Sequence, residues 1–272
     1  MQNIIPMKRI ITFIFLFAAL NLSARYQTKN DITYSQNTDE YSAERCRLDI
    51  HYNDSLTGLP VVIWFHGGGL TGGNRKIPKE LQNSGYVVIA PNYRLLPNVE
   101  ISDCIDDAAA AVAWAFRNVK NFGGDTSKIF VAGHSAGGYL TSMIGLERKW
   151  LAKYGIEADS IAALVPYSGQ VITHFAHRKL KGVSEMQPMV DEYAPLFHIR
   201  KDAPPYIIIT GDAEMELFGR YEENLYMWRM LNLIGHPDAQ IFKLDGYNHG
   251  DMARPAHHIL KQQIKRITTG KK

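Results

Sequence analysis

A serine between two glycines is the side chain of this sequence best placed to do chemistry. Gly133, Ser135 and Gly137 form a G-x-S-x-G run. The run follows the apolar stretch 128–132 and precedes a helix-compatible stretch, 138–148. A strand, a sharp turn and a helix in this order hold a serine hydroxyl clear of the sheet, where it can attack a carbonyl carbon. We therefore predict that Ser135 is the nucleophile of an acyl-transfer reaction.

A second glycine-rich run could stabilise the negative charge that such an attack creates. Glycines 67–69 follow shortly after the apolar stretch 59–65, which indicates a buried strand. Glycines leave their backbone amides unshielded, so these amides can donate to a developing alkoxide. We expect an oxyanion hole made by the amides of Gly68, Gly69 and Ala136, the residue after the nucleophile.

One histidine is well placed to be the base that a serine nucleophile needs. His249 lies in the segment 246–250, which follows the last apolar stretch of the chain. A loop at that point reaches the carboxyl edge of a parallel sheet, where the serine turn also lies. Two carboxylates that could orient the histidine, Asp212 and Glu214, follow the apolar stretch 205–210. We therefore expect a Ser-His-acid triad in which either carboxylate could serve.

The order of these motifs resembles that of a known family. The chain is similar to α/β-hydrolases of the hormone-sensitive-lipase-like carboxylesterase group, and in particular to small bacterial acetyl-xylan and feruloyl esterases. The similarity runs from about residue 47 to residue 267. The motifs that carry it are HGGG at 66–69, PNYRL at 91–95, Asp125 and Ile129 before the serine turn, GHSAGG at 133–138 and NHG at 248–250.

The resemblance implies both a fold and an activity. The fold is the α/β-hydrolase fold, a doubly wound, mostly parallel sheet with helices on both faces and a small cap insertion. The activity is that of a serine carboxylesterase acting on short acyl esters of carbohydrates. The alternatives are a lipase-like esterase or an amide-cleaving hydrolase of the same fold, and a catalytically inactive binding protein.

The resemblance also bears on the choice of acid. Family members commonly place the triad acid three residues after a glycine, in a G-x-x-D pattern. Counted from Gly211, that position is Glu214, so this sequence departs from the usual aspartate. We favour Glu214 and keep Asp212 as the alternative, and we expect the carboxylate that is not the acid to make hydrogen bonds within the turn.

Short apolar stretches alternate with helix-compatible ones, which independently favours a doubly wound sheet. An antiparallel edge strand is expected at 47–52, where apolar and polar residues alternate. The other expected strands are 59–65, 86–91, 128–132, 161–167, 205–210 and 240–244. The expected helices are 76–84, 102–118, 136–148, 220–234 and 255–268. Segment 170–201 follows neither pattern, and in the resembling family this crossover carries the cap over the active site.

The N-terminus has the pattern of a secretory signal peptide. Two basic residues precede the apolar run 10–20, and Ala24 offers a small residue at a cleavage position. The run is shorter than the roughly 20 residues that span a membrane. We therefore expect an exported protein, periplasmic or extracellular, without a stable membrane anchor. Its parts would be a signal peptide at 1–24, a loose leader at 25–39 and one hydrolase domain at 40–272.

Composition narrows the set of partners. The 272 residues carry a formal net charge of +3, which falls to +1 when Lys8 and Arg9 leave with the signal peptide. Such a balance gives no reason to expect nucleic acid as a partner. No motif calls for a cofactor and no Cys/His spacing suggests a metal, so the expected partner is a small-molecule or carbohydrate ester. For the two cysteines, Cys46 and Cys104, we expect buried free thiols rather than the disulfide that export would permit.

Overall fold

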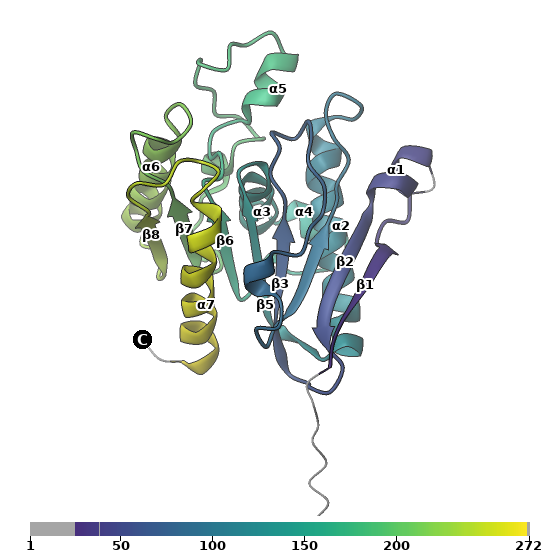
Figure 1. Cartoon of the computed structure of the whole chain (residues 1–272). Coiled ribbons are helices and arrows are strands. Elements are labelled where there is room, and N and C mark those ends of the chain that lie inside the picture. The colour runs from purple at the N-terminus through teal and green to yellow at the C-terminus, as the bar shows by residue number, and fades with distance from the viewer. Residues whose placement is uncertain (1–24, 38, 271–272) are drawn as a thin grey trace, which may run out of the picture.

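One eight-stranded sheet organises the chain (Figure 1). The computed structural model describes residues 25–37 and 39–270, so the predicted signal peptide at 1–24 lies outside the described part. The strands run across the sheet in the order β1-β2-β4-β3-β5-β6-β7-β8. Their bounds are β1 Tyr26–Thr33, β2 Arg47–Asn53, β3 Leu59–Phe65, β4 Val87–Pro91, β5 Gly124–His134, β6 Ala163–Tyr167, β7 Tyr206–Thr210 and β8 Ala239–Lys243.

The strand order creates a switch point in the middle of the sheet. Strand β2 pairs antiparallel with both β1 and β4, and the remaining neighbours pair parallel. The chain moves outward from β3 to β4 and then crosses back over β3 to β5. Open α/β sheets bind ligands at such a reversal, beyond the carboxyl ends of the strands. The loops after β3 and β5 are therefore the ones that the topology brings together.

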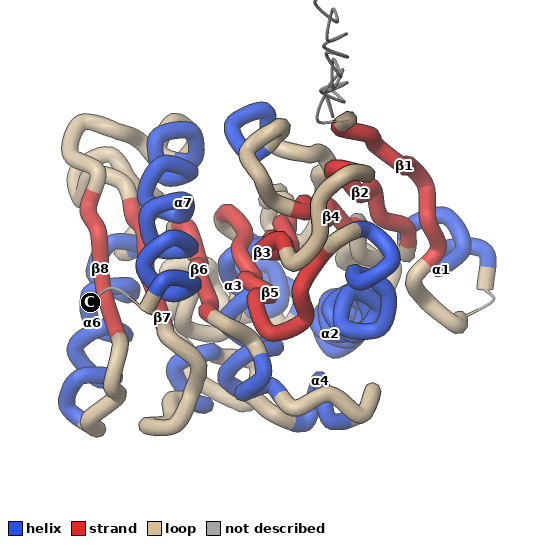
Figure 2. The backbone as a smooth tube through the Cα atoms, turned by 90° about the horizontal axis from the view of Figure 1, so that it is seen from below, coloured by secondary structure: helices blue, strands red, loops and turns tan. Residues whose placement is uncertain are grey.

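Helices cover both faces of the sheet. Helix α7 lies on one face, and α2, α3, α4 and α6 lie on the other (Figure 2). The bounds are α1 Glu40–Arg45, α2 Ile101–Asn118, α3 Ala136–Leu146, α4 Lys149–Ala152, α5 Phe175–Leu180, α6 Arg220–Leu233 and α7 Ala253–Thr269.

The central strands are apolar at every position because each face of the sheet has its own core. Along β3, Val61 and Ile63 enter the core beneath α2 and α3, whereas Val62 and Trp64 enter the core beneath α7. A strand buried on both faces needs apolar side chains at consecutive positions rather than at alternate ones. The predicted mostly parallel, doubly wound fold is confirmed.

The N-terminal part of the domain differs from the prediction. The loose leader expected at 25–39 is wrong for most of its length, because Tyr26–Thr33 forms β1 and pairs antiparallel with β2. The predicted strand at 47–52 is present as β2, but β1 takes the edge position. Most side chains of β1 are polar and exposed, so backbone hydrogen bonds hold this strand and no apolar pattern marks it in the sequence.

The helix expected at 76–84 is also wrong. Only a short 3₁₀ helix forms there, at Lys79–Leu81. Gln82 returns to an extended conformation, and Asn83 has φ 52°, so the backbone leaves the helical region at once. The other predicted helices are present with ends shifted by a few residues.

The sequence also led to expectations for the two cysteines and for the segment 170–201. Cys46 and Cys104 are both free and buried, as predicted. The segment 170–201 contains α5 and a 3₁₀ helix at Pro195–His198, and α5 lies above the carboxyl ends of the strands (Figure 1). Among the described residues, no helix is long and apolar enough to cross a membrane.

Candidate active site

The turn that carries Ser135 is a strained strand-to-helix elbow. Strand β5 ends just before Ser135 and helix α3 begins just after it, so this residue makes the turn with φ 56° and ψ −115°. Non-glycine residues rarely adopt positive φ, and such strain costs about 1–3 kcal/mol unless the surroundings enforce it. The neighbouring glycines allow it, because a Cβ on Gly137 would lie 2.1 Å from the carbonyl oxygen of Phe65. The Ser135 amide also donates to a carbonyl of β6 at 2.8 Å, which ties the elbow to the sheet.

The glycine loop after β3 lies directly against the elbow. A Cβ on Gly67 would be 3.4 Å from the Cβ of Ser135. Gly68 and Gly69 have φ 118° and 64°, and two later amides of the loop donate to the Gly68 carbonyl. Within the described part of the chain, the amides of Gly68, Gly69 and Ala136 donate to no protein acceptor. These amides are therefore available to a ligand beside Ser135.

A histidine joins the serine to a carboxylate. The Nε2 atom of His249 lies 2.9 Å from Oγ of Ser135, and its Nδ1 atom lies 2.6 Å from Oε2 of Glu216. The side chain of Glu216 is fully buried, and that of His249 is 16% exposed. A serine, an imidazole and a buried carboxylate connected in this way form the arrangement that activates a hydroxyl nucleophile.

The carboxylate against His249 is Glu216, so the expectation of Glu214, with Asp212 as alternative, is wrong. The turn after Gly211 is longer than the G-x-x-D spacing assumes, because the amides of residues 215 and 216 both donate to the Asp212 carbonyl. One helical turn then carries Glu216 back over the Gly211 amide, while Glu214 points to solvent. Asp212 accepts hydrogen bonds from the amides of Glu214 (3.0 Å) and Gly246 (2.7 Å), which is the turn role expected of the unused carboxylate.

Several donors hold the Glu216 carboxylate in its ionised form. Its Oε1 atom accepts from the Gly211 amide at 2.9 Å and from the Ser168 hydroxyl, leaving Oε2 to His249. Burial by itself would raise the pKa of Glu216, but the hydrogen bonds with His249 and Ser168 outweigh it and lower the pKa to about 2. A permanently charged acceptor therefore faces Nδ1 of His249 at neutral pH.

Two other histidines of the motifs, His134 and His66, make hydrogen bonds to the loops that surround Ser135. His134, inside the elbow, donates from Nε2 to the backbone carbonyl of His249 at 2.7 Å. Burial lowers the pKa of His134 to about 4, so the ring is neutral and can make this bond as an N–H donor. His66 stacks on Tyr93 with ring centroids 4.4 Å apart and donates from Nδ1 to the Gly67 carbonyl at 2.7 Å. These contacts fix the positions of the glycine loop and of the loop 246–250 that carries His249, called the histidine loop below.

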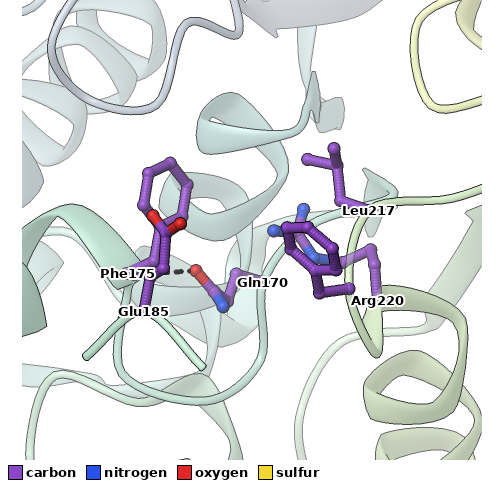
Figure 3. A pocket seen from close by; sticks show the side chains of 6 residues that line it. Gln170, Phe175, Glu185, Leu217 and Arg220 are labelled. Atoms are coloured by element: carbon purple, nitrogen blue, oxygen red, sulfur yellow. Dashed lines mark hydrogen bonds between the residues drawn. The ribbon is translucent and has the colours of Figure 1, made fainter. Parts of the chain in front are cut away.

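A small cavity opens beside the triad, between the segment 170–201 and the start of α6 (Figure 3). Its volume is about 140 Å³, and its lining residues are Gln170, Phe175, Glu185, Leu217, Phe218 and Arg220. The triad serine and histidine do not line it. A Cβ on Gly69 would nevertheless lie 3.1 Å from the Phe175 ring, and Leu217 directly follows Glu216. The cavity therefore borders both the glycine loop and the loop of the acid.

Sequence reasoning missed several residues of this site. Glu216 was not considered, although it is the third carboxylate within five residues of the same loop. Ser168 directly follows β6, the strand beside the elbow, and this position is the signal that could have drawn attention to it. Arg220 carried no signal at all. In the described ranges, no cluster of three or more His, Cys, Asp or Glu side chains could hold a metal ion.

Comparison with known families places this geometry in context. The family model BD-FAE matches residues 48–219. Among curated proteins, the chain is 27% identical over 214 residues to the esterase LipC of Mycobacterium tuberculosis, covering 70% of this chain and 53% of that protein. It is 24% identical over 265 residues to the isoprenylcysteine alpha-carbonyl methylesterase ICME of Arabidopsis thaliana, covering 88% and 60%. The chain thus spans only about half the length of the curated relatives it matches.

Solved structures show the same architecture. A truncated carbohydrate esterase from gut microbiota superposes with a TM-score of 0.75 at 18% identity, covering 89% of this chain and 96% of that one. Inhibited esterase B from Lactobacillus rhamnosis superposes with a TM-score of 0.72 at 18% identity, covering 90% and 88%. At these identities the likeness concerns the fold.

Proposed function

Because this chain belongs to the BD-FAE family of α/β-hydrolases and connects Ser135, His249 and Glu216 by hydrogen bonds, we propose that it is a serine carboxylesterase that cleaves short acyl esters of carbohydrates. The observation that carries the proposal is the strained serine 2.9 Å from an imidazole nitrogen, with a buried carboxylate behind the ring. Each group has the role that acyl transfer requires of it.

The acylation step follows from these contacts. His249 Nε2 takes the proton of the Ser135 hydroxyl as the oxygen attacks the ester carbonyl carbon. The Glu216 carboxylate holds the proton on Nδ1, so that Nε2 is the basic nitrogen, and it then stabilises the imidazolium. His249 next gives its proton to the leaving alcohol, and an acyl-serine remains.

The negative charge of the tetrahedral intermediate would fall beside the glycine loop. We assign the oxyanion hole to the amides of Gly68, Gly69 and Ala136, which are unused within the described residues and lie next to Ser135. Helix α3 begins at Ala136, so the positive end of its dipole adds to this stabilisation. Water activated by His249 then cleaves the acyl-enzyme by the reverse sequence.

The finer parts of the proposal concern substrate and location. The carbohydrate part rests on the resemblance to acetyl-xylan and feruloyl esterases, and the small cavity supports a preference for short acyl groups. The segment 170–201 is proposed as the cap, because its Phe175 ring reaches the glycine loop. We also propose export through residues 1–24. N-terminal sequencing of the protein recovered from a secreting host should then start at Arg25, and a retained N-terminus would contradict export.

Replacement of the nucleophile is the direct test. Ser135→Ala should fold normally and lose on the order of 10⁴–10⁶ in kcat on p-nitrophenyl acetate. Ser142→Ala is the matched control, since Ser142 is a buried serine further along the same helix whose hydroxyl meets Tyr206 rather than the triad. Activity of Ser135→Ala within tenfold of wild type would rule out this nucleophile. An inactive wild type would instead favour a binding protein on the same fold.

A substrate panel tests the proposed preference for short acyl esters of carbohydrates. Acetylated xylan, feruloyl sugars and p-nitrophenyl esters of increasing chain length should show faster turnover of acetate than of palmitate. Preference for long-chain esters would favour the lipase-like alternative, and faster cleavage of matched anilides would favour amide hydrolysis.

A further inference from the structure

A buried arginine beside the triad has donors that no group of the described residues uses. Arg220 opens helix α6, is 3% exposed, and donates from Nη1 to the carbonyl of Ser168 at 2.6 Å. Its buried Nε atom has no hydrogen-bond partner among the described residues. Among the residues described, no acidic side chain lies within ion-pair distance of its guanidinium. Burial lowers the pKa of Arg220 below its ordinary value, but arginine stays cationic at any working pH.

The buried arginine Arg94 of the same chain has its donors paired with a carboxylate. Arg94 donates from Nε and Nη2 to the two oxygens of Asp107, both at 2.8 Å. Arg178 donates from both terminal nitrogens to backbone carbonyls of the segment 170–201, and only its Nε atom has no partner among the described residues. Arg220 leaves open the edge of the guanidinium that Arg94 uses for a carboxylate. An unpaired buried donor is costly, and Arg220 combines such a donor with a position in the wall of the cavity beside the triad.

The two nearest carboxylates balance the charge of Arg220 without occupying its donors. Glu223 accepts from Gln170 Nε2 at 3.3 Å and from the Val171 amide at 3.0 Å, which fixes it to the segment 170–201. Glu216 is committed to the triad and its supporting donors. Both therefore act on Arg220 through space, and its open edge remains for a ligand.

The side chain of Arg220 points toward the other residues that line the cavity beside the triad (Figure 3). Arg220 lines the space of about 140 Å³ together with the apolar side chains of Phe175, Leu217 and Phe218 (Figure 3). A single water needs roughly 10–15 Å³ of such volume, so the cavity can hold a small organic group. Gln170, also in the lining, cannot serve as a free acceptor because its Oε1 atom accepts from the Phe175 amide at 2.9 Å.

We propose that Arg220 binds a carboxylate of the substrate, so that the enzyme prefers esters bearing a free carboxylate within a few bonds of the scissile ester. The inference rests on the proposed function, because it places the substrate of that same reaction. A guanidinium fork fits the two oxygens of a carboxylate, and a charged acceptor satisfies it better than a neutral hydroxyl does. The apolar side chains of Phe175, Leu217 and Phe218 line the cavity with Arg220 and Gln170, and Glu185 is the acidic side chain in the lining.

Two matched substrate pairs test the inference on the wild-type enzyme. Monomethyl succinate against methyl succinamate varies charge on the acyl side, and acetoxyacetate against acetoxyacetamide varies it on the alcohol side. In at least one pair the charged ester should have a kcat/KM about 10- to 100-fold higher, mainly through a lower KM. Cleavage of p-nitrophenyl acetate without any preference for a charged ester would overturn the inference and leave the proposed function standing. Failure on every ester would overturn both.

Variants then assign the preference to one side chain. Arg220→Gln should reduce the charged-to-neutral ratio to near one, and Arg220→Lys, which keeps the charge but not the fork, should retain part of it. Because the ratio is taken within each variant, a general loss of activity cancels. Arg229→Gln, which removes an exposed arginine from the same helix, is the control and should keep the wild-type ratio. If Arg220→Gln does not fold, Arg220→Lys decides, and an unchanged ratio in either variant would overturn the assignment.

Discussion

The active-site edge has two sides that are built in different ways. On the side of β3 and β5, the glycine loop and the elbow meet backbone to backbone, with Gly137 against Phe65 and Gly67 against Ser135. On the side of β6, β7 and α6, long side chains make the contacts, as when Glu216 reaches across its loop to His249. The first side requires glycine at positions such as 67 and 137, because a Cβ there would lie against the neighbouring segment. The second requires only a side chain of sufficient reach, and several residues of one loop have it.

The two sides should differ in how well they tolerate substitution. On the backbone side, one added methyl group has nowhere to go, since interiors are close-packed and backbone cannot rotate away. On the side of β6, β7 and α6, the carboxylates of Asp212, Glu214 and Glu216 lie close together in the sequence, but only Glu216 contacts His249. We therefore expect their replacements to differ sharply in their effect on activity. The variants below test this contrast, beginning with the largest expected effect.

The strongest test exchanges the three carboxylates of the loop after β7. Glu216→Gln should lower kcat on the order of 10⁴-fold, because a neutral amide neither fixes the tautomer of His249 nor stabilises its cation. Glu214→Gln and Asp212→Asn are matched controls and should stay within a few-fold of wild type. Steady-state kinetics of the three variants at neutral pH decide the matter. A mild Glu216→Gln with a large loss in Glu214→Gln would return the acid to the position that the family spacing favours, and with a large loss in Asp212→Asn it would make Asp212 the acid.

Acid titration tests the same side chain through stability. The pKa of Glu216 is lowered to about 2 in the folded protein, so its contribution to stability is present above the unfolded value near 4.3 and is lost as pH falls toward 2. The excess stability of wild type over Glu216→Gln should therefore shrink by about 3 kcal/mol between pH 5 and pH 2. Denaturant unfolding of both proteins at several pH values measures this. A pH-independent difference would mean that Glu216 is not held ionised by its donors.

On the backbone side, Gly137→Ala should destabilise the fold by about 2 kcal/mol, since the added Cβ would lie 2.1 Å from the Phe65 carbonyl oxygen. For a domain of this size that lowers Tm by several degrees. Gly72→Ala is the control, because the nearest atom to its Cβ would be 3.8 Å away. Thermal unfolding followed by circular dichroism should separate the two. Equal Tm values would show that the elbow can relax and that the contrast between the two sides is overstated.

The smallest expected effect concerns His134, which joins the two sides. Removing its hydrogen bond to the His249 carbonyl in His134→Leu should cost about 5- to 30-fold in kcat. His134→Gln, whose amide can donate in the same direction, should recover part of this loss. Measurement of kcat for both variants on one ester is sufficient. Equal losses in Leu and Gln variants would mean that ring packing, not the hydrogen bond, positions the histidine loop.

The two motif segments, 59–69 and 128–148, could be predicted from the sequence because their signals are local, whereas the helix expected between them at 76–84 did not form. The predicted strand at 59–65 has the bounds of β3, and the glycines around Ser135 allow the strained φ of 56° that the G-x-S-x-G pattern predicts. His249 was found for a related reason, since the loop after the last strand of such a sheet must end at the carboxyl edge. Turn geometry and strand burial depend on residues a few positions apart, so residue types and spacing are enough to predict them.

The remaining features depend on how the folded chain brings its segments together. Strand β1 exists because its backbone pairs with β2, and its polar side chains carry no pattern of burial. Glu216 contacts His249 because a helical turn between residues 212 and 216 directs this carboxylate, and not the two before it, over Gly211. Arg220 faces a cavity whose walls come from segments some 50 residues apart, such as Gln170 and Arg220 itself. Contacts of this kind depend on where distant segments meet, and residue types and local spacing do not encode that.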